Sequence, residues 1–394
     1  MRAIVVGAGI AGLVTARQLG LAGWDVVLVE GSPGLRAAGY MMDFFGPGVE
    51  ASERIGLYPP LAAVAYRVDA AEYVDTGGRV TSRLDYERFA RIAGGKVLSL
   101  MRPDLELAAL EALEDVPAGR VRVRYGARVR RAWADHDGVG VEVDGLETET
   151  LTGDVLIGAD GIHSEVRAQL FGPEPDFLRP LGMRAAAYIV DAPDLHAQVR
   201  NRFVLTDSLN RMAGLYGLRT SQVAAFLVYP DAGTMSGEDQ AGTRGRLRER
   251  FAGLGAGIDQ LLALCPENPY DDVVAQIVMP SWHRHRVILV GDACGAVSLL
   301  AGQGGSLAIA GAALLGEVLG PVSSPELIGG ALTDVEGRWW PFVEKAQASG
   351  RRAAASFLPA NSTQRLIRRW IIRAAGVPGI DQIVARQILK RIAT

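Results

Sequence analysis

The sequence has very few cysteines, and this limits what can hold its fold together. Only Cys265 and Cys294 occur among 394 residues, and their positions do not match any metal-ligand spacing. The pattern excludes a disulfide framework. We therefore expect no metal site, and a reducing cytoplasm as the simplest compartment.

The sequence also lacks long apolar runs and a strong charge of one sign. No run of about twenty uncharged apolar residues occurs, so we expect no transmembrane helix. The net charge of −3 and the pI of about 6.0 do not supply the concentrated positive field that nucleic-acid binding needs. The strand expected at residues 2–6 leaves no room for the charged region and cleavage site of a signal peptide. We expect a protein that binds neither nucleic acid nor, through a spanning helix, a membrane.

No arrangement of residues typical of side-chain catalysis stands out. The sequence shows no Ser-His-Asp set, no metal cluster and no paired catalytic carboxylates, so we name no catalytic residue. In contrast, 49% of the residues are hydrophobic and 22% are charged. A chain of this length and composition can bury the core of two domains. Its chemistry is expected to come from a cofactor.

Residues 4–30 are expected to form a strand, a glycine-rich turn, a helix and a second strand. The turn has the spacing G-x-G-x-x-G, which permits a tight turn, close approach of a pyrophosphate and close helix packing. The helix N-terminus offers free N–H groups to phosphates. An acid at the end of the second strand can accept a hydrogen bond from a ribose hydroxyl. The unit predicts a dinucleotide site without deciding between NAD and FAD. Its candidate residues are Gly7, Gly9, Ala11, Gly12 and Glu30.

The rest of the chain alternates between helical and β patterns. We expect a helix over 97–115, a β meander over 120–157 that returns to the first sheet, and a separate antiparallel sheet containing 184–190 and 223–229. A buried strand at 287–290 and an apolar helix at 303–319 then return to the first domain.

The predicted fold class is therefore α/β, with a Rossmann-like domain built from discontinuous segments. This domain takes residues 1–65, 96–175 and 280–350, and an antiparallel-sheet substrate domain takes 66–95 and 176–279. Residues 351–394 form a C-terminal helical segment, which is basic and amphipathic from about Thr363. Two interpretations of it stay open: a helix packed across both domains with a solvated basic face, or a contact with a membrane surface or a partner.

Two further motifs, together with the first, give the chain a resemblance to a known family. One is GADGIHSEVR at 158–167, which contains Asp160, and the other is Gly291-Asp292 followed by AGQGG at 301–305. In this order and spacing the motifs resemble those of the class A flavoprotein monooxygenases, which have the p-hydroxybenzoate hydroxylase fold. The resemblance implies that FAD is the dinucleotide and that Asp160 contributes to the FAD environment and to nicotinamide binding.

The third motif also has a direct physical interpretation. Asp292 follows a buried strand and can hydrogen-bond a ribityl hydroxyl, while the next helix N-terminus can stabilise negative charge on a reduced flavin. The alternatives are an ordinary Asp-capped turn here and a purely turn-organising Asp160. Besides Asp160 and Asp292, the cofactor candidates from these motifs are Gly302, Gly304 and Gly305.

Three more residues are assigned through the resemblance. Arg102 resembles a helix-borne arginine that reaches FAD, although a surface arginine at a helix start is the ordinary alternative. Arg36 and Asp43 resemble residues of the tetracycline-inactivating branch, where the arginine is associated with the nicotinamide cofactor and the aspartate with FAD. The chain departs from the family by having Gly31 after the ribose acid and by lacking His and Pro in 291–299.

The reaction implied by the resemblance is reduction of FAD by NAD(P)H, addition of O2 to give a C4a-hydroperoxide, and oxygen transfer to a small organic substrate. The branch points to an aromatic or polyketide-like molecule, such as an antibiotic. Two rival functions remain: a flavin reductase or dehydrogenase without oxygen insertion, and a non-enzymatic flavin- or ligand-binding protein. A halogenase is disfavoured because its Trp-x-Trp-x-Ile-Pro signature is missing. Candidate substrate residues in the second sheet are Arg184, Tyr188, Arg211, Tyr216 and Tyr229.

Overall fold

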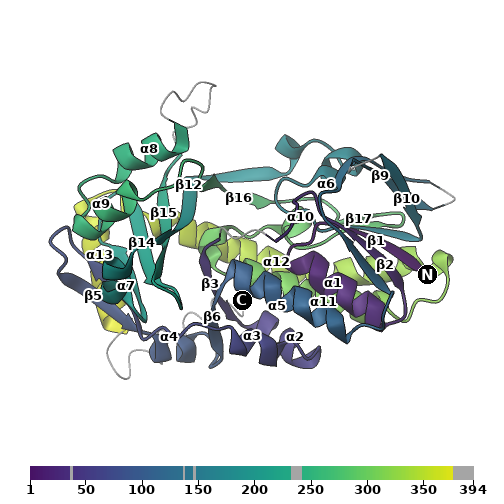
Figure 1. The fold of residues 1–394 in the computed structure, drawn as a ribbon, viewed down its shortest axis with the longest axis horizontal. Coiled ribbons are helices and arrows are strands. Elements are labelled where there is room, and N and C mark those ends of the chain that lie inside the picture. Colours follow the sequence, from purple (N-terminus) through teal and green to yellow (C-terminus); the bar gives the residue numbers. More distant parts are fainter. Residues whose placement is uncertain (36–38, 136–137, 145–147, 232–241, 376–394) are drawn as a thin grey trace.

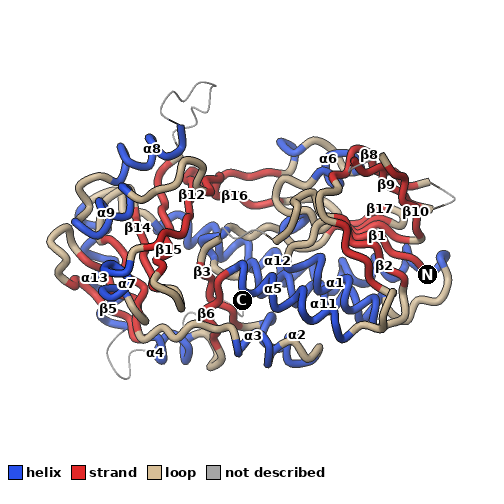
Figure 2. The backbone as a smooth tube through the Cα atoms, viewed as in Figure 1, coloured by secondary structure: helices blue, strands red, loops and turns tan. Residues whose placement is uncertain are grey.

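The computed structural model describes residues 1–35, 39–135, 138–144, 148–231 and 242–375. The molecule has two lobes, each with its own sheet (Figure 1). Figure 2 shows strands gathered in opposite lobes, with long helices between them. Helix α12 (Ile328–Phe357) contacts elements of both sheets and extends from one lobe into the other.

The first lobe is built on a six-stranded sheet that is mostly parallel. In spatial order its strands are β17 (His283–Arg284), β18 (Val287–Leu289), β11 (Val155–Gly158), β1 (Arg2–Val6), β2 (Asp25–Val29) and β7 (Val121–Arg124). Only the β17–β18 pair is antiparallel. The central strands are runs of buried apolar residues because both faces of the sheet are covered.

Different layers cover the two faces of this sheet. Helices α1 (Ile10–Leu21) and α11 (Gly304–Leu319) share one apolar cluster with one face. The other face packs against an antiparallel three-stranded sheet of β8 (Arg128–Ala134), β9 (Val139–Asp144) and β10 (Glu149–Gly153). The motif-bearing turns at the strand ends are therefore supported from both sides.

The second lobe is built on a seven-stranded sheet. In spatial order its strands are β16 (Tyr270–Ile277), β12 (Leu178–Asp191), β15 (Gln222–Pro230), β14 (Met212–Gly217), β13 (Arg202–Thr206), β4 (Ala70–Val74) and β5 (Val80–Asp85). All pairs are antiparallel except β13 with β4. One face is covered by α7 (Pro193–Val199), α8 (Gly242–Phe251) and α9 (Ala256–Ala263). The opposite face meets a smaller sheet that belongs to neither lobe's main sheet.

That smaller sheet corrects the helix expected over 97–115. Residues Val97–Met101 form β6, which pairs antiparallel with β3 (Met41–Phe45). The helix α5 begins only at Arg102 and ends at Glu111, and Pro103 occupies its first turn, where a proline is tolerated. The long-range pairing with β3 decided the conformation of 97–101, and the local apolar spacing did not reveal it.

The remaining described helices are short connections around the two lobes. They are α2 (Pro47–Arg54), α3 (Tyr58–Ala63), α4 (Tyr86–Ile92), α6 (Glu165–Leu170), α10 (Asp292–Gly295), η1 (Ala112–Asp115), η2 (Glu174–Asp176), η3 (Leu299–Ala301) and η4 (Pro325–Leu327). None of the helices in the described part of the chain combines the length and apolar character needed to cross a membrane.

The C-terminal segment differs from its prediction in two ways. The division expected at 350/351 falls inside α12, so the segment does not begin as a separate unit. Helix α13 (Ser362–Ala375) lies beside β5, at the end of the molecule opposite the N-terminus (Figure 1). The expected solvated basic face is wrong for Arg368 and Arg369, because both contact the buried carboxylate of Asp207.

Candidate functional site

One pocket of about 380 Å³ brings the first two motifs together at the carboxyl ends of the parallel strands. In open α/β sheets ligands bind outside this edge. The predicted residues in its lining are Gly7, Gly9, Glu30, Arg102 and Asp160, and the sequence analysis did not single out Glu106, Tyr125 or Arg128, which also line it.

Close backbone approach explains the glycines of the first motif. Gly7 has a φ of +102°, and a Cβ there would lie 2.4 Å from the Ala159 carbonyl oxygen. A Cβ on Gly12 would lie 1.8 Å from the Gly7 carbonyl oxygen. Ala11 packs where a Cβ on Gly291 would be only 2.9 Å away, so the first and third motifs touch. Larger residues would push the turn off the sheet.

Glu30 closes the turn around the pocket. Its carboxylate accepts hydrogen bonds from the backbone N–H groups of Ala8 and Ser32, both at 2.8 Å. A carboxylate has about four lone-pair positions, so it can accept further donors from a ligand in the pocket. These two bonds fix the Glu30 carboxylate in the lining of the pocket.

Arg102 links the pocket to the third motif. Its Nε donates to a Glu106 carboxylate oxygen at 3.0 Å, which orients the guanidinium from the first turn of α5. Burial raises the pKa of the Asp292 carboxyl, and the positive charge of Arg102 opposes that rise. Arg102 also acts electrostatically on Tyr40, whose pKa burial raises. Arg102 therefore acts electrostatically both on Asp292 of the third motif and on Tyr40.

Two helices begin within the third motif, near Arg102. Asp292 opens α10, and a Cβ on Gly304 would lie 4.0 Å from its Oδ1, so the N-terminus of α11 is close to the carboxylate. Gly302 has a φ of +65° and ends the turn before α11. Gly305 packs against Met42, where a Cβ would be 2.6 Å from its sulfur. The glycines allow α11 to start beside Asp292.

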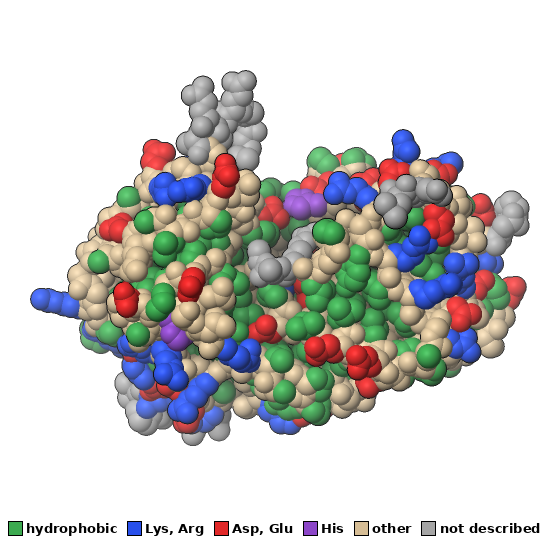
Figure 3. Space-filling model, in the orientation of Figure 1, with side chains coloured by type: hydrophobic (Ala, Val, Ile, Leu, Met, Phe, Trp, Pro, Cys, Tyr) green, Lys and Arg blue, Asp and Glu red, His purple; other side chains and the backbone are tan. Residues whose placement is uncertain are grey.

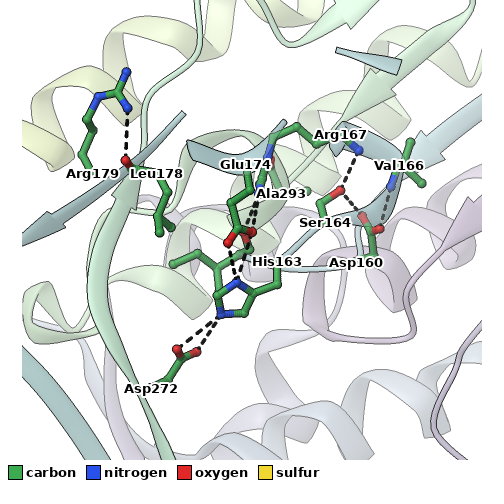
Figure 4. Close-up of polar contacts among 11 residues, drawn as sticks. Asp160, His163, Ser164, Val166, Arg167, Glu174, Leu178, Arg179, Asp272 and Ala293 are labelled. Carbon is green, nitrogen blue, oxygen red and sulfur yellow. Dashed lines mark hydrogen bonds and ion pairs between the residues drawn. The ribbon is translucent and has the colours of Figure 1, made fainter. Parts of the chain in front are cut away.

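Asp160 organises its own turn in the structure. Its carboxylate accepts from the Ser164 hydroxyl at 2.6 Å and from the Val166 N–H at 3.1 Å (Figure 4). Burial raises the pKa of this carboxyl, and these hydrogen bonds counter the rise. The fully buried Arg167 donates to the carbonyl oxygen of Ala293, tying this turn to the third motif.

His163, three residues beyond Asp160, bridges the lobes. Figure 4 shows its ring between the carboxylates of Glu174 and Asp272. Nδ1 lies 3.1 Å from Glu174 and Nε2 lies 3.2 Å from Asp272, which belongs to β16 of the large sheet. The hydrogen bond to Asp272 is the largest influence, and together the two carboxylates raise the pKa of His163 to about 9.

Of the two residues assigned through the tetracycline-inactivating branch, the structure describes only Asp43. Arg36 lies outside the described residues. Asp43 does not line the pocket, and its Oδ1 accepts from the hydroxyls of Tyr86 and Ser99. Asp43 is therefore not among the residues of this pocket, and its assignment to FAD stays a prediction.

Most of the proposed substrate residues lie on the helix-covered side of the large sheet. Tyr188 donates to the Leu261 carbonyl oxygen of α9 at 3.3 Å. Arg184 and Tyr229 both bond Asp271, at 3.1 and 2.8 Å. The Arg211 guanidinium donates to a carbonyl oxygen of α8, that of Arg250. These polar groups serve the packing of α8, α9 and β16.

Tyr216 alone of that set lies on the opposite face. Its hydroxyl accepts a hydrogen bond from the Met41 N–H, which joins the large sheet to β3. On this side Tyr40 packs against Phe226 and Tyr270, with ring centroids 5.7 and 6.4 Å apart. The strands of this sheet carry apolar residues on both faces, and alternation does not say which face meets the other lobe. The sequence alone therefore could not distinguish this side from the helix-covered side.

Comparisons with known proteins agree with this geometry. Residues 1–326 match the family model described as FAD binding domain. An uncharacterized protein of Mycobacterium tuberculosis (strain ATCC 25618 / H37Rv) is 33% identical over 384 residues, covering 95% of this chain and all of that protein. A flavin-dependent monooxygenase from an unknown prokaryotic organism is 28% identical, covering 90% of each chain.

Solved structures show the same architecture. Tetracycline destructase Tet(55) superimposes with a TM-score of 0.78 at 25% identity, covering 97% of this chain and 96% of that one. Klebsiella pneumoniae HpxO, complexed with FAD and uric acid, has a TM-score of 0.79 at 22% identity over 100% and 97% of the chains, a likeness of fold alone.

The fold and pocket are those of an FAD-dependent oxidoreductase of the class A monooxygenase type. The chain belongs to the FAD-binding-domain family. The resemblance and fold class expected from the motifs are confirmed.

Proposed function

We propose that this protein takes electrons from NAD(P)H and inserts one atom of O2 into a mainly apolar aromatic or polyketide-like molecule, while the other atom leaves as water. The observation that carries the proposal is the position of Arg102 between two regions. It lines the glycine-rich dinucleotide pocket, and it also interacts with Tyr40, which forms an aromatic wall with Phe226 of β15 and Tyr270 of β16. A cytoplasmic location is part of the proposal and fits the two free cysteines.

The residues present fit FAD. A Cβ at Gly7 or Gly12 would collide with the backbone of Ala159 or Gly7, so the glycines let the turn pack tightly against its neighbours. The α1 N-terminus that follows this turn would face a diphosphate. Glu30 would hold the ribose, and Arg102 would supply charged donors to the diphosphate or ribityl chain. Asp292 would accept from a ribityl hydroxyl. When bound, FAD supplies the electron transfer and oxygen activation that no side chain of this site provides.

The protein's own contribution is positioning and exclusion of water. The α11 N-terminus beside Asp292 would favour negative charge near it. Tyr40, Phe226 and Tyr270 offer rings against which a flat apolar substrate would pack. Tyr216 remains in the substrate-facing set, whereas Arg184, Tyr188, Arg211 and Tyr229 are left out of it because their polar groups bond α8, α9 and β16. Arg36 stays a prediction for the nicotinamide contact.

Labelled oxygen separates this proposal from a reductase. Purified holoenzyme is incubated with NAD(P)H, ¹⁸O2 and a panel of polycyclic aromatic compounds, and the product masses are measured by mass spectrometry. We expect one ¹⁸O atom per product and oxidation of one NAD(P)H. A product with added hydrogen and no label would identify a reductase, and no NAD(P)H turnover with any compound would favour a binding protein.

Glu30→Gln tests the cofactor half separately. Loss of a charged hydrogen bond costs about 1.5–3 kcal/mol, so the dissociation constant of FAD should rise about tenfold to a hundredfold. Fluorescence titration of the apoprotein with FAD measures it. Glu344→Gln, at an exposed position on α12, is the matched control. Equal FAD affinity in wild type and Glu30→Gln would remove Glu30 from the ribose role.

A further inference from the structure

The dinucleotide pocket crosses the carboxyl edge of the six-stranded sheet from β1 to β7. The glycine turn follows β1, Glu30 follows β2, and Arg128 comes shortly after β7. Because β2 lies between β1 and β7, Glu30 lies between the glycine turn and Arg128. In the FAD site proposed above, on which this inference rests, the turn faces the diphosphate and Glu30 the ribose. The adenine would then come next in line, beside Arg128.

Backbone contacts hold Arg128 at this end of the pocket. The N–H of the preceding residue, Ala127, donates to the Glu30 carbonyl oxygen at 2.9 Å. A Cβ on Gly31 would lie 3.9 Å from the Cα, Cβ and Cγ atoms of Arg128. The first part of the Arg128 side chain therefore packs beside Gly31, directly after the ribose acid, and no side chain at residue 31 competes with it for this space.

Arg128 differs from the other arginines of β8 in having no acidic partner. Arg130 lies 3.6 Å from an Asp144 carboxylate oxygen, and Arg131 lies 3.7 Å from Glu142. Figure 3 shows basic and acidic side chains intermingled over this lobe. Arg128 stands opposite Asp144 in the strand register, yet Asp144 pairs with Arg130. Among the described residues nothing forms a hydrogen bond or an ion pair with the exposed Arg128 guanidinium, so it is free to contact a ligand in the pocket.

The residues around Arg128 suit a flat base better than a further phosphate. Ala127, Val129 and Val29 are buried apolar residues that also line the pocket. An arginine near the ribose can accommodate a 2′-phosphate, but the Glu30 carboxylate would repel that group. A guanidinium is planar and stacks on aromatic rings. We propose that Arg128 holds the adenine of FAD by stacking on it, and thereby makes this site prefer FAD to FMN.

Fluorescence titration of the full-length apoprotein with FAD and with FMN tests this. Arg128→Ala should raise the dissociation constant of FAD about tenfold, as expected for loss of a partly desolvated cation–π contact. FMN, which lacks the adenosine half, should bind wild type and Arg128→Ala equally. The matched control is Arg130→Ala, which removes an arginine of the same strand that pairs with Asp144 and does not line the pocket. This control should bind FAD as wild type does.

Two replacements separate stacking from charge. Arg128→Tyr keeps a flat ring without the charge and should recover most of the FAD affinity that Arg128→Ala loses. Arg128→Lys keeps the charge without the plane and should recover less. Three results would each overturn the stacking role: wild-type FAD affinity in Arg128→Ala, an equal loss of FMN affinity in that variant, or recovery by Arg128→Lys and not by Arg128→Tyr, which indicates a phosphate contact. Failure of the wild-type protein to bind FAD would instead overturn the proposed function as well.

Discussion

The dinucleotide pocket and the aromatic wall are built in different ways. The pocket comes from turns at the ends of adjacent parallel strands, and each turn carries a short motif. The wall comes from Tyr40, β15 and β16, which meet only after the second sheet has formed and packed against β3. Local sequence therefore specifies the pocket, and long-range pairing specifies the wall.

The two regions should consequently respond differently to substitution. In the pocket, backbone packs closely against backbone in the glycine turn, so a single added methyl group displaces the turn. In the wall, side chains supply the surface, so removing one group changes stability or packing without destroying the site. The following predictions test that difference and then the contact between the two lobes.

The largest effect is expected for Gly12→Ala. The new Cβ would meet the Gly7 carbonyl oxygen at 1.8 Å, and neither backbone can move away without separating α1 from the sheet. The cost should reach or exceed the upper end of the about 1–3 kcal/mol typical of overpacking. We expect almost no FAD in the purified protein, measured by absorbance after release. Gly337→Ala, where nothing lies within 4 Å, should retain FAD fully; normal FAD content in Gly12→Ala would contradict the close approach.

A smaller effect is expected for Tyr216→Phe, on β14 next to the wall. The change leaves the half-buried Met41 N–H without its acceptor, which costs about 1–3 kcal/mol. Urea unfolding should show this loss, while FAD affinity changes little because the pocket lining is intact. Tyr58→Phe, on the half-buried α3, should change stability by about 0.5 kcal/mol or less. A large loss of FAD affinity in Tyr216→Phe would show that wall and pocket are not separable.

The smallest effect is expected for His163→Gln, at the contact between the two lobes. The folded pKa of about 9 lies above the ordinary value of 6.5. The ion pairs therefore contribute fully below about pH 6.5, and their contribution is lost as pH rises through about 9. Because the ring is half exposed, we expect about 1 kcal/mol. Wild-type Tm should fall between pH 6.5 and 9 more than that of His163→Gln, and Asp272→Asn should behave like the variant. If the Tm of wild type and of His163→Gln changed with pH in the same way, a charged bridge through His163 would be excluded.

Several expectations from sequence show where local patterns suffice. The strand, turn and helix around Gly7 and Glu30 form as expected because a buried parallel strand and its glycine turn are encoded within thirty residues. The helix expected over 97–115 was wrong at its start because β3, more than fifty residues away, pairs with 97–101. No local signal distinguishes a short apolar segment that forms a paired β-strand from one that forms a helix.

The sequence by itself determined the class of the protein: glycine spacing, a ribose acid and two later aspartate motifs are requirements of a backbone that approaches a dinucleotide, and they can be read residue by residue. The tertiary structure alone decided that Tyr216 faces the other lobe while Tyr188 and Tyr229 face helices, and that α13 turns its arginines inward. The physical reason is that strands and amphipathic helices each have two faces. Which face is buried depends on the partner that packs against it, such as β3 or the buried Asp207, and that partner lies far away in the sequence.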